Sequence, residues 1–130
     1  MIAVDTNVLA RILTRDEPAQ VRKALRRLRG QEVWLSKTVL LETERVLRYS
    51  YDLSRPAIAH AFQRLLGYPL ARIEDRQTVV VALESYVAGL DFADALHLAS
   101  AREAGVFFTF DRTLARRAPH RTGLPAVKAV

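Results

Sequence analysis

The sequence predicts an α/β fold, in which a small and mostly parallel central sheet of four to five strands carries helices on both faces. Short β-prone runs alternate along the chain with helical patterns of roughly 10 to 15 residues, an order typical of parallel sheets. The chain has 130 residues, a common length for one domain. It contains no internal repeat, low-complexity tract or linker. We therefore expect a single domain over residues 1–130.

In the first half of the chain, the spacing of apolar residues separates helices from strands. One basic helix is expected to begin with Asp16 as its N-cap and Pro18 in its first turn, and to stop at Gly30. In order, the expected elements are a strand over 1–5, helices over 6–13 and 16–29, a strand over 32–36, and helices over 37–50 and 54–66.

In the second half, Asp75 is expected to cap a helix that follows the 3.6-residue period despite three consecutive β-branched valines. Gly105 marks the end of the next helix, and a buried-type strand then runs directly into Asp111. The expected elements are a weak strand over 71–73, helices over 75–90 and 91–104, a strand over 106–110, a short basic helix, and a last strand near 126–130.

Composition limits the kinds of active site and the kinds of partner that the chain can have. The chain has no cysteine, which excludes disulfides, thiolate nucleophiles and cysteine-ligated zinc. Lys and Arg number 20 against 14 Asp and Glu, a net charge of +6, so the partner is a nucleic acid or an acidic protein unless the surface is merely basic. The helix over 16–29 carries much of this charge, which suits either an RNA backbone or a solvated face. With no targeting segment and no bilayer-spanning run, the protein is expected to be cytoplasmic, without a membrane partner.

Four acidic residues fall where an α/β sheet binds ligands, outside the carboxyl ends of its strands. Asp5 and Asp111 each follow a strand, Glu42 lies on the helix after the second strand, and Asp94 lies in the first turn of a later helix. If they converge, each pair about 4 Å apart repels by about 4 kcal/mol at an effective dielectric near 20. Such a cluster needs a cation, and oxygen ligands favour Mg²⁺, or alternatively Mn²⁺. The chemistry expected is attack of a metal-activated water on a phosphodiester.

Each acid also has a purely structural interpretation. Asp5 and Asp111 could be N-caps at strand-to-helix junctions. Glu42 shares an apolar stripe with Val39, Val46 and Tyr49, where it could pair with an arginine instead of a metal.

Asp91 and Asp94 stand three residues apart at a helix start, as capping residues do. We assign Asp91 as the cap or as a residue that supports the ligands, and Asp94 as the ligand, although these roles could be exchanged. Arg112 and Arg116 adjoin the expected site and are candidate phosphate-binding residues.

These motifs resemble those of the PIN-domain nucleases, and in particular the VapC-like toxins of type II toxin-antitoxin pairs. Asp5-Thr6-Asn7 after the first strand is similar to the family's first motif, and Leu41-Glu42 resembles its second. Residues 91–99 resemble the third, and Thr109-Phe110-Asp111-Arg112 the fourth. The motifs span most of the chain in the family's order.

The resemblance implies a Mg²⁺-dependent endoribonuclease, a toxin that cleaves RNA and is inhibited by a small VapB-like antitoxin, and a homodimer. By the same resemblance, Asp5, Glu42, Asp94 and Asp111 are the catalytic and metal-binding residues, and Asn7 and Thr109 steady them by hydrogen bonding.

Two other functions fit part of the pattern. An Asp-dependent phosphohydrolase would use Asp5 as a nucleophile, but it needs a second Asp two residues later, where this chain has Asn7. A catalytically inactive module that binds RNA or an antitoxin is disfavoured by the intact set of four acids.

Overall fold

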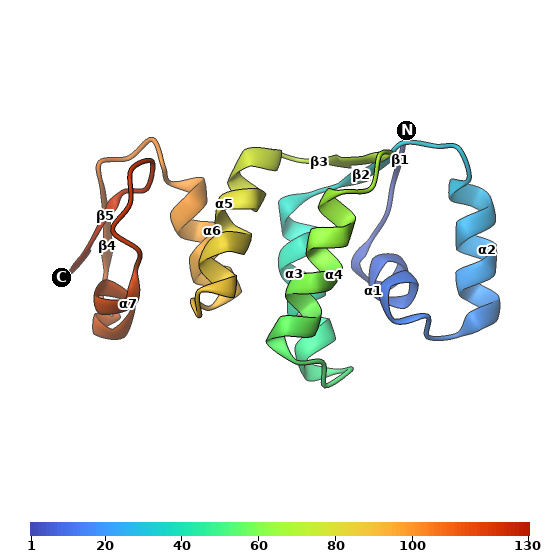
Figure 1. The fold of residues 1–130 in the computed structure, drawn as a ribbon, viewed down its shortest axis with the longest axis horizontal. Coiled ribbons are helices and arrows are strands. Elements are labelled where there is room, and N and C mark those ends of the chain that lie inside the picture. Colours follow the sequence, from blue (N-terminus) through green and yellow to red (C-terminus); the bar gives the residue numbers. More distant parts are fainter. The chain divides into compact units, whose positions relative to one another are not determined.

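A computed structural model describes residues 1–130 and confirms the α/β class. The chain forms two compact units, Met1–Arg76 and Gln77–Val130, and each is described by itself (Figure 1). None of the helices combines the length and the hydropathy that a bilayer crossing requires.

The first unit is built on a three-stranded parallel sheet with strand order β1-β2-β3. Ile2 pairs with Val33, and Val33 with Ala71, so the three strands run in register. The carboxyl ends of all three strands consequently lie at one edge of this sheet. Its elements are β1 (Ile2–Ala3), α1 (Thr6–Thr14), α2 (Pro18–Leu28), β2 (Val33–Leu35), α3 (Lys37–Tyr49), α4 (Arg55–Leu66) and β3 (Ala71–Ile73).

Side-chain caps begin most helices of this unit. Asp5, Ser36 and Ser54 accept hydrogen bonds from the third residue of α1, α3 and α4 respectively. The expected cap of α2 was wrong: Glu17, in a left-handed conformation with φ of 55°, precedes Pro18 and makes no side-chain cap. The Asp16 carboxylate instead accepts a hydrogen bond from the hydroxyl of Tyr51, a residue distant in sequence, at 2.8 Å.

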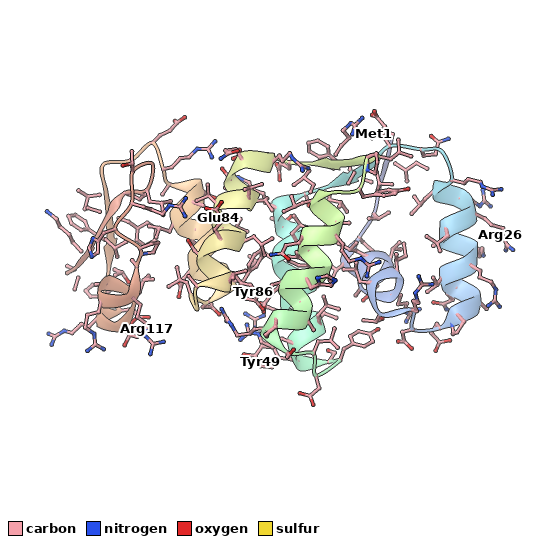
Figure 2. The ribbon with its side chains drawn as sticks, viewed as in Figure 1. Met1, Arg26, Tyr49, Glu84, Tyr86 and Arg117 are labelled. Atoms are coloured by element: carbon pink, nitrogen blue, oxygen red, sulfur yellow. The ribbon has the colours of Figure 1, made fainter.

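Helices α3 and α4 supply much of the core of the first unit. Leu40 and Leu47 of α3 and Ile58 and Phe62 of α4 are almost completely buried. Glu44 is buried among them and is neutralised by Arg48 at 3.0 Å, one turn later. Tyr49, by contrast, ends α3 with 70% of its surface exposed (Figure 2).

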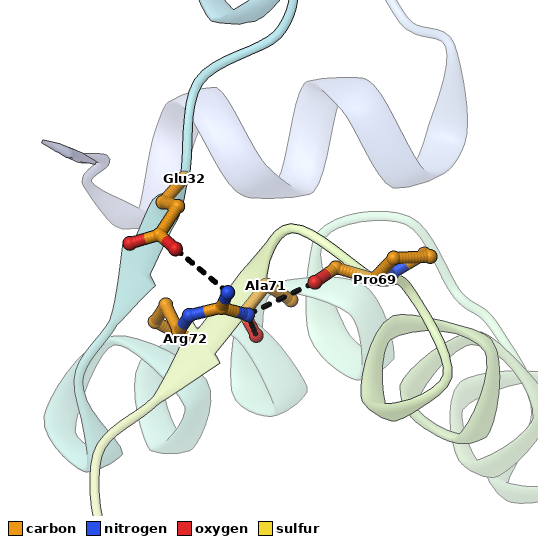
Figure 3. Close-up of polar contacts among 4 residues, drawn as sticks. All are labelled: Glu32, Pro69, Ala71 and Arg72. Carbon is orange, nitrogen blue, oxygen red and sulfur yellow. Dashed lines mark hydrogen bonds and ion pairs between the residues drawn. The ribbon is translucent and has the colours of Figure 1, made fainter.

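Arg72 of β3 ties the sheet edge to the segment before β2. Its guanidinium contacts the Glu32 carboxylate at 2.7 Å and donates to the Pro69 carbonyl oxygen at 2.9 Å (Figure 3). Because both groups of the ion pair are almost half exposed, the pair contributes at most about 1 kcal/mol. It helps to fix the register of β3 against β2.

The second unit contains two parallel strands and three helices. Its strands pair from Val106 with Ala126 to Thr109 with Ala129. Tyr86 and Phe92 pack edge to face with ring centroids 5.3 Å apart, and both are buried. The elements are α5 (Arg76–Val87), which starts on the last residue of the first unit, α6 (Phe92–Ser100), β4 (Val106–Thr109), α7 (Arg112–Arg117) and β5 (Ala126–Ala129).

The helix expected over 91–104 ends four residues early. The Ala101 N–H donates to the carbonyl oxygens of both His97 and Leu98 at 3.1 Å. This shared bond tightens the last turn and closes the helix. Residues 101–105 form a turn instead, and Gly105 then leads into β4.

Candidate active site

Asp5 stands at the carboxyl edge of the three-stranded sheet, between β1 and α1. Its Oδ1 accepts a hydrogen bond from the Val8 N–H at 2.9 Å, which makes it the N-cap of α1. The side chain is exposed, and Oδ2 has no hydrogen-bond partner in the chain. One carboxylate oxygen therefore orders the helix, while the other is free to bind a cation or substrate.

Glu42 is held beside the start of α1 by a contact that sequence reasoning missed. The Thr6 hydroxyl, on a side chain only 6% exposed, donates to Oε2 of Glu42 at 2.9 Å. Thr6 directly follows Asp5, so this bond brings Glu42 to the same end of α1. The helix N-terminus also favours negative charge there. The only signal in the sequence is that Thr6 directly follows Asp5.

The apolar stripe expected around Glu42 was wrong. Glu42 is exposed, Val39 and Val46 are half-buried and Tyr49 is exposed. The face of α3 that packs into the core instead carries Leu40, Thr43, Glu44 and Leu47. Glu42 therefore needs no partner to offset burial.

In the second unit, Asp91 caps α6 and leaves Asp94 without a partner. An Asp91 carboxylate oxygen accepts from the Asp94 N–H at 3.3 Å, which confirms the capping assignment. The Asp94 side chain is half-buried, and no hydrogen bond or ion pair reaches its carboxylate. Burial raises the pKa of Asp94 above its ordinary value, and the charges of Asp91 and then Asp111 raise it further, while His97 opposes them.

Asp111 is arranged like Asp5, at the end of a strand and the start of a helix. One oxygen accepts from the Leu114 N–H at 3.0 Å and caps α7. The Asp111 N–H donates to the Thr109 hydroxyl oxygen at 3.0 Å. The exposed carboxylate lies close enough to Asp94 for the two charges to repel.

The remaining candidates lie around these acids. Asn7 is exposed and lines, with Asp5, a cavity of about 140 Å³ between α1 and α2. Arg112 and Arg116 are exposed on α7, where Arg116 donates to the Thr113 hydroxyl at 3.4 Å. Glu74 also follows a strand, but its carboxylate is engaged with the Lys37 N–H at 2.8 Å.

The donor chemistry of both units suits a hard divalent cation. The available groups are carboxylate oxygens, with no thiolate in the chain. Neither unit by itself gathers three or more acidic or histidine side chains closely enough to hold a metal ion. In the first unit Asp5 and Glu42 lie at the same end of α1, and in the second unit Asp111 lies near Asp94.

A family model described as the PIN domain matches residues 2–119 of the chain. The matched range contains all four candidate acids and extends over both units. No curated protein and no solved structure matches the chain.

Proposed function

We infer that this chain, which belongs to the PIN domain family, is a Mg²⁺-dependent endoribonuclease. Family membership indicates a nuclease, a hydrolase whose substrate is a nucleic acid and whose chemistry uses a divalent metal ion. Beyond what family membership indicates, we propose that the substrate is RNA and that the metal ion is Mg²⁺, for which Mn²⁺ can substitute. The observation that supports a cation at this site is the half-buried Asp94 carboxylate, which has no partner and faces the negative charges of Asp91 and Asp111. RNA as the substrate rests on the motif resemblance.

An unneutralised cluster of this kind lowers stability unless a cation binds. Burial disfavours the charged form of Asp94, and two neighbouring carboxylates add to the cost. Folded proteins retain such arrangements mainly at functional sites. We propose that Asp5, Glu42, Asp94 and Asp111 hold the divalent ion.

Each residue of the proposed site has a distinct role in the reaction. A bound divalent ion would activate water as the nucleophile and stabilise negative charge on the phosphate. Asp5 and Asp111 present one free oxygen each while their other oxygen caps a helix. Thr6 orients Glu42, and Asp91 orders the turn that carries Asp94. Arg112 and Arg116 are proposed to bind substrate phosphates, and Asn7 to hydrogen-bond beside Asp5.

We further propose that the nuclease is the toxin of a VapC-like pair. The motif resemblance supports a small VapB-like antitoxin as its inhibitor, a homodimeric assembly and a cytoplasmic location. An excess of positive charge, +6 over 130 residues, is compatible with both an RNA substrate and an acidic inhibitor.

The direct test is cleavage of single-stranded RNA by the purified full chain. We expect cleavage with Mg²⁺ or Mn²⁺, loss of cleavage in EDTA, and recovery when excess Mg²⁺ is restored, because the carboxylates alone supply no activated nucleophile. Gel analysis of a labelled RNA measures all three states. Single-stranded DNA of the same sequence serves as the substrate control. Equal cleavage rates in Mg²⁺ and in chelator would contradict the metal assignment.

Thr6→Val tests the positioning of Glu42. Valine preserves the shape of this nearly buried side chain but removes the donor to Oε2 of Glu42. Loss of a bond that orients a metal ligand typically costs 10- to 100-fold in metal affinity or activity. We expect cleavage to fall by about tenfold, with a matching rise in the Mn²⁺ concentration needed for half-maximal rate.

Thr6→Ser is the matched control, since it keeps the hydroxyl and loses only a methyl group. It should restore most of the cleavage rate, and thermal melting should show all three proteins folded. A valine variant as active as the wild type, at every Mn²⁺ concentration, would show that Glu42 does not depend on Thr6.

A further inference from the structure

Helix α2 carries a set of positive charges that nothing in the structure neutralises. All the cations on it and at its C-terminal end are exposed, none forms an ion pair, and the helix itself contains no acid. Like charges one turn apart on a helix are unfavourable by about 0.2–0.5 kcal/mol per pair. The residues are Arg22, Lys23, Arg26, Arg27 and Arg29. This surface therefore favours a polyanionic partner.

Helical spacing divides the four cations within α2 between two sides of the helix, while Arg29 lies at its C-terminal end. Gln20, Val21 and Ala24 line the cavity that also contains Asp5 and Asn7. Lys23 and Arg27 are not lining residues, but they lie beside Gln20 and Ala24 on the helix, since residues 20, 23, 24 and 27 are spaced i, i+3, i+4 and i+7. We call Lys23 and Arg27 the cavity-side pair.

Arg22 and Arg26 lie on a different side of the helix. They are spaced one turn apart, about 100° around the axis from the cavity-side pair. Arg26 points away from the rest of the first unit (Figure 2). Arg22 and Arg26, the outer pair, carry the same charge on the same helix but lie farther around the axis from Gln20 and Ala24, which line the Asp5 cavity.

We propose that the cavity-side pair binds the phosphate backbone of single-stranded RNA and guides it toward Asp5. This inference rests on the proposed ribonuclease function. Lys23 and Arg27 are exposed and free to donate to phosphate oxygens, and Asp5 lines the cavity that their neighbours Gln20 and Ala24 also line. Backbone contacts of this kind are independent of sequence and weaken as salt rises.

An acidic protein is the alternative polyanion, and the chemistry of this side of α2 disfavours it. Stable protein interfaces have an apolar or aromatic centre, whereas the side defined by Gln20, Lys23, Ala24 and Arg27 offers only one methyl group. Leu25 and Leu28 line a second cavity of about 480 Å³, and Val21 lines both cavities. Phosphate binding requires only the exposed cations.

The test compares two double variants with equal loss of charge, K23Q/R27Q and R22Q/R26Q. Glutamine preserves helix propensity, and circular dichroism with thermal melting checks that both variants fold. Affinity for a labelled single-stranded RNA of mixed sequence is measured in EDTA over a range of KCl concentrations, so that no RNA is cut. Cleavage of the same RNA is measured separately in Mg²⁺.

For K23Q/R27Q we expect the slope of log Kd against log salt to fall by about 1.4, because each phosphate contact with a single strand contributes about 0.7. R22Q/R26Q should keep the wild-type slope. Equal loss in both variants would mean a diffuse effect of net charge and would overturn the proposal. An unchanged slope in K23Q/R27Q would also overturn it, and is the result expected if this side binds an acidic protein.

Different results would contradict the role of the cavity-side pair and the proposed ribonuclease function. A wild-type protein that cuts RNA, together with an unchanged slope in K23Q/R27Q, removes only the assignment of the cavity-side pair. A wild-type protein that neither binds nor cuts RNA removes the proposed function, and this assignment with it.

Discussion

Asp94→Asn is expected to remove RNA cleavage, with a rate loss on the order of 10³-fold, while the protein stays folded. Asparagine has nearly the same shape as aspartate but no charge, so it is a poor ligand for a hard divalent ion. Metal stabilisation of a phosphodiester reaction is worth several kcal/mol, and each 1.36 kcal/mol is a factor of ten in rate. Single-turnover cleavage under saturating Mg²⁺ measures the loss.

The same substitution should increase stability when metal is absent. Burial and the charges of Asp91 and Asp111 raise the pKa of Asp94 above its ordinary value, so the folded protein holds this proton more tightly than the unfolded chain does. Stability is then lost as pH rises from the ordinary carboxyl pKa through the raised one. Melting in EDTA should show Asp94→Asn more stable than wild type above that range, and equally stable below both pKa values.

Added Mg²⁺ or Mn²⁺ should reverse the order of the two proteins. A ligand that binds only the folded state stabilises it, so wild type should gain melting temperature with metal and the variant should gain much less. Glu103→Gln is the charge-matched control, because Glu103 is exposed in the same unit, and it should retain both cleavage and the metal response. An Asp94→Asn protein that cuts RNA at the wild-type rate would exclude Asp94 as a ligand.

Features set by short-range chemistry could be predicted from the sequence. The α/β order follows from periodicity, and the cap at Asp91 follows from a residue type that satisfies helix N–H groups within three residues. The acids at strand ends could be selected for the same reason, because strand boundaries are local features. Whether Asp5, Glu42, Asp94 and Asp111 share one metal ion is a long-range question, and it stays a prediction.

The wrong or missed predictions concern contacts between residues that are distant in sequence. Asp16 was expected to cap α2, yet Tyr51, which lies 35 positions later, holds its carboxylate. The stripe that contains Glu42 has helical spacing, but it lies on the wrong face of α3, because the buried face carries Leu40 and Leu47. Thr6 was overlooked because its partner Glu42 is 36 positions away. Periodicity carries no information about such pairs.

Asp5→Asn and Asp5→Ala together separate the two roles of this residue. Asn caps helices about as well as Asp, whereas Ala costs about 1 kcal/mol at that position. We expect Asp5→Asn to melt close to wild type and Asp5→Ala to lose about 1 kcal/mol of unfolding free energy, measured by urea denaturation. Both should lose cleavage by at least about 100-fold, because only the aspartate supplies the free, charged Oδ2.

Ser54→Ala provides the control for a lost cap in the same unit. Ser54 accepts from the Ala57 N–H at 3.3 Å at the start of α4, so its removal should also cost about 1 kcal/mol but leave cleavage of the folded fraction intact. If capping were the whole role of Asp5, Asp5→Asn would cut RNA normally and Asp5→Ala would behave like Ser54→Ala. If Asp5 binds the metal, asparagine and alanine are equally inactive and differ only in stability. The comparison thus separates the carboxylate charge of Asp5 from the shape and hydrogen bonding of its side chain. The proposed metal chemistry depends on that charge.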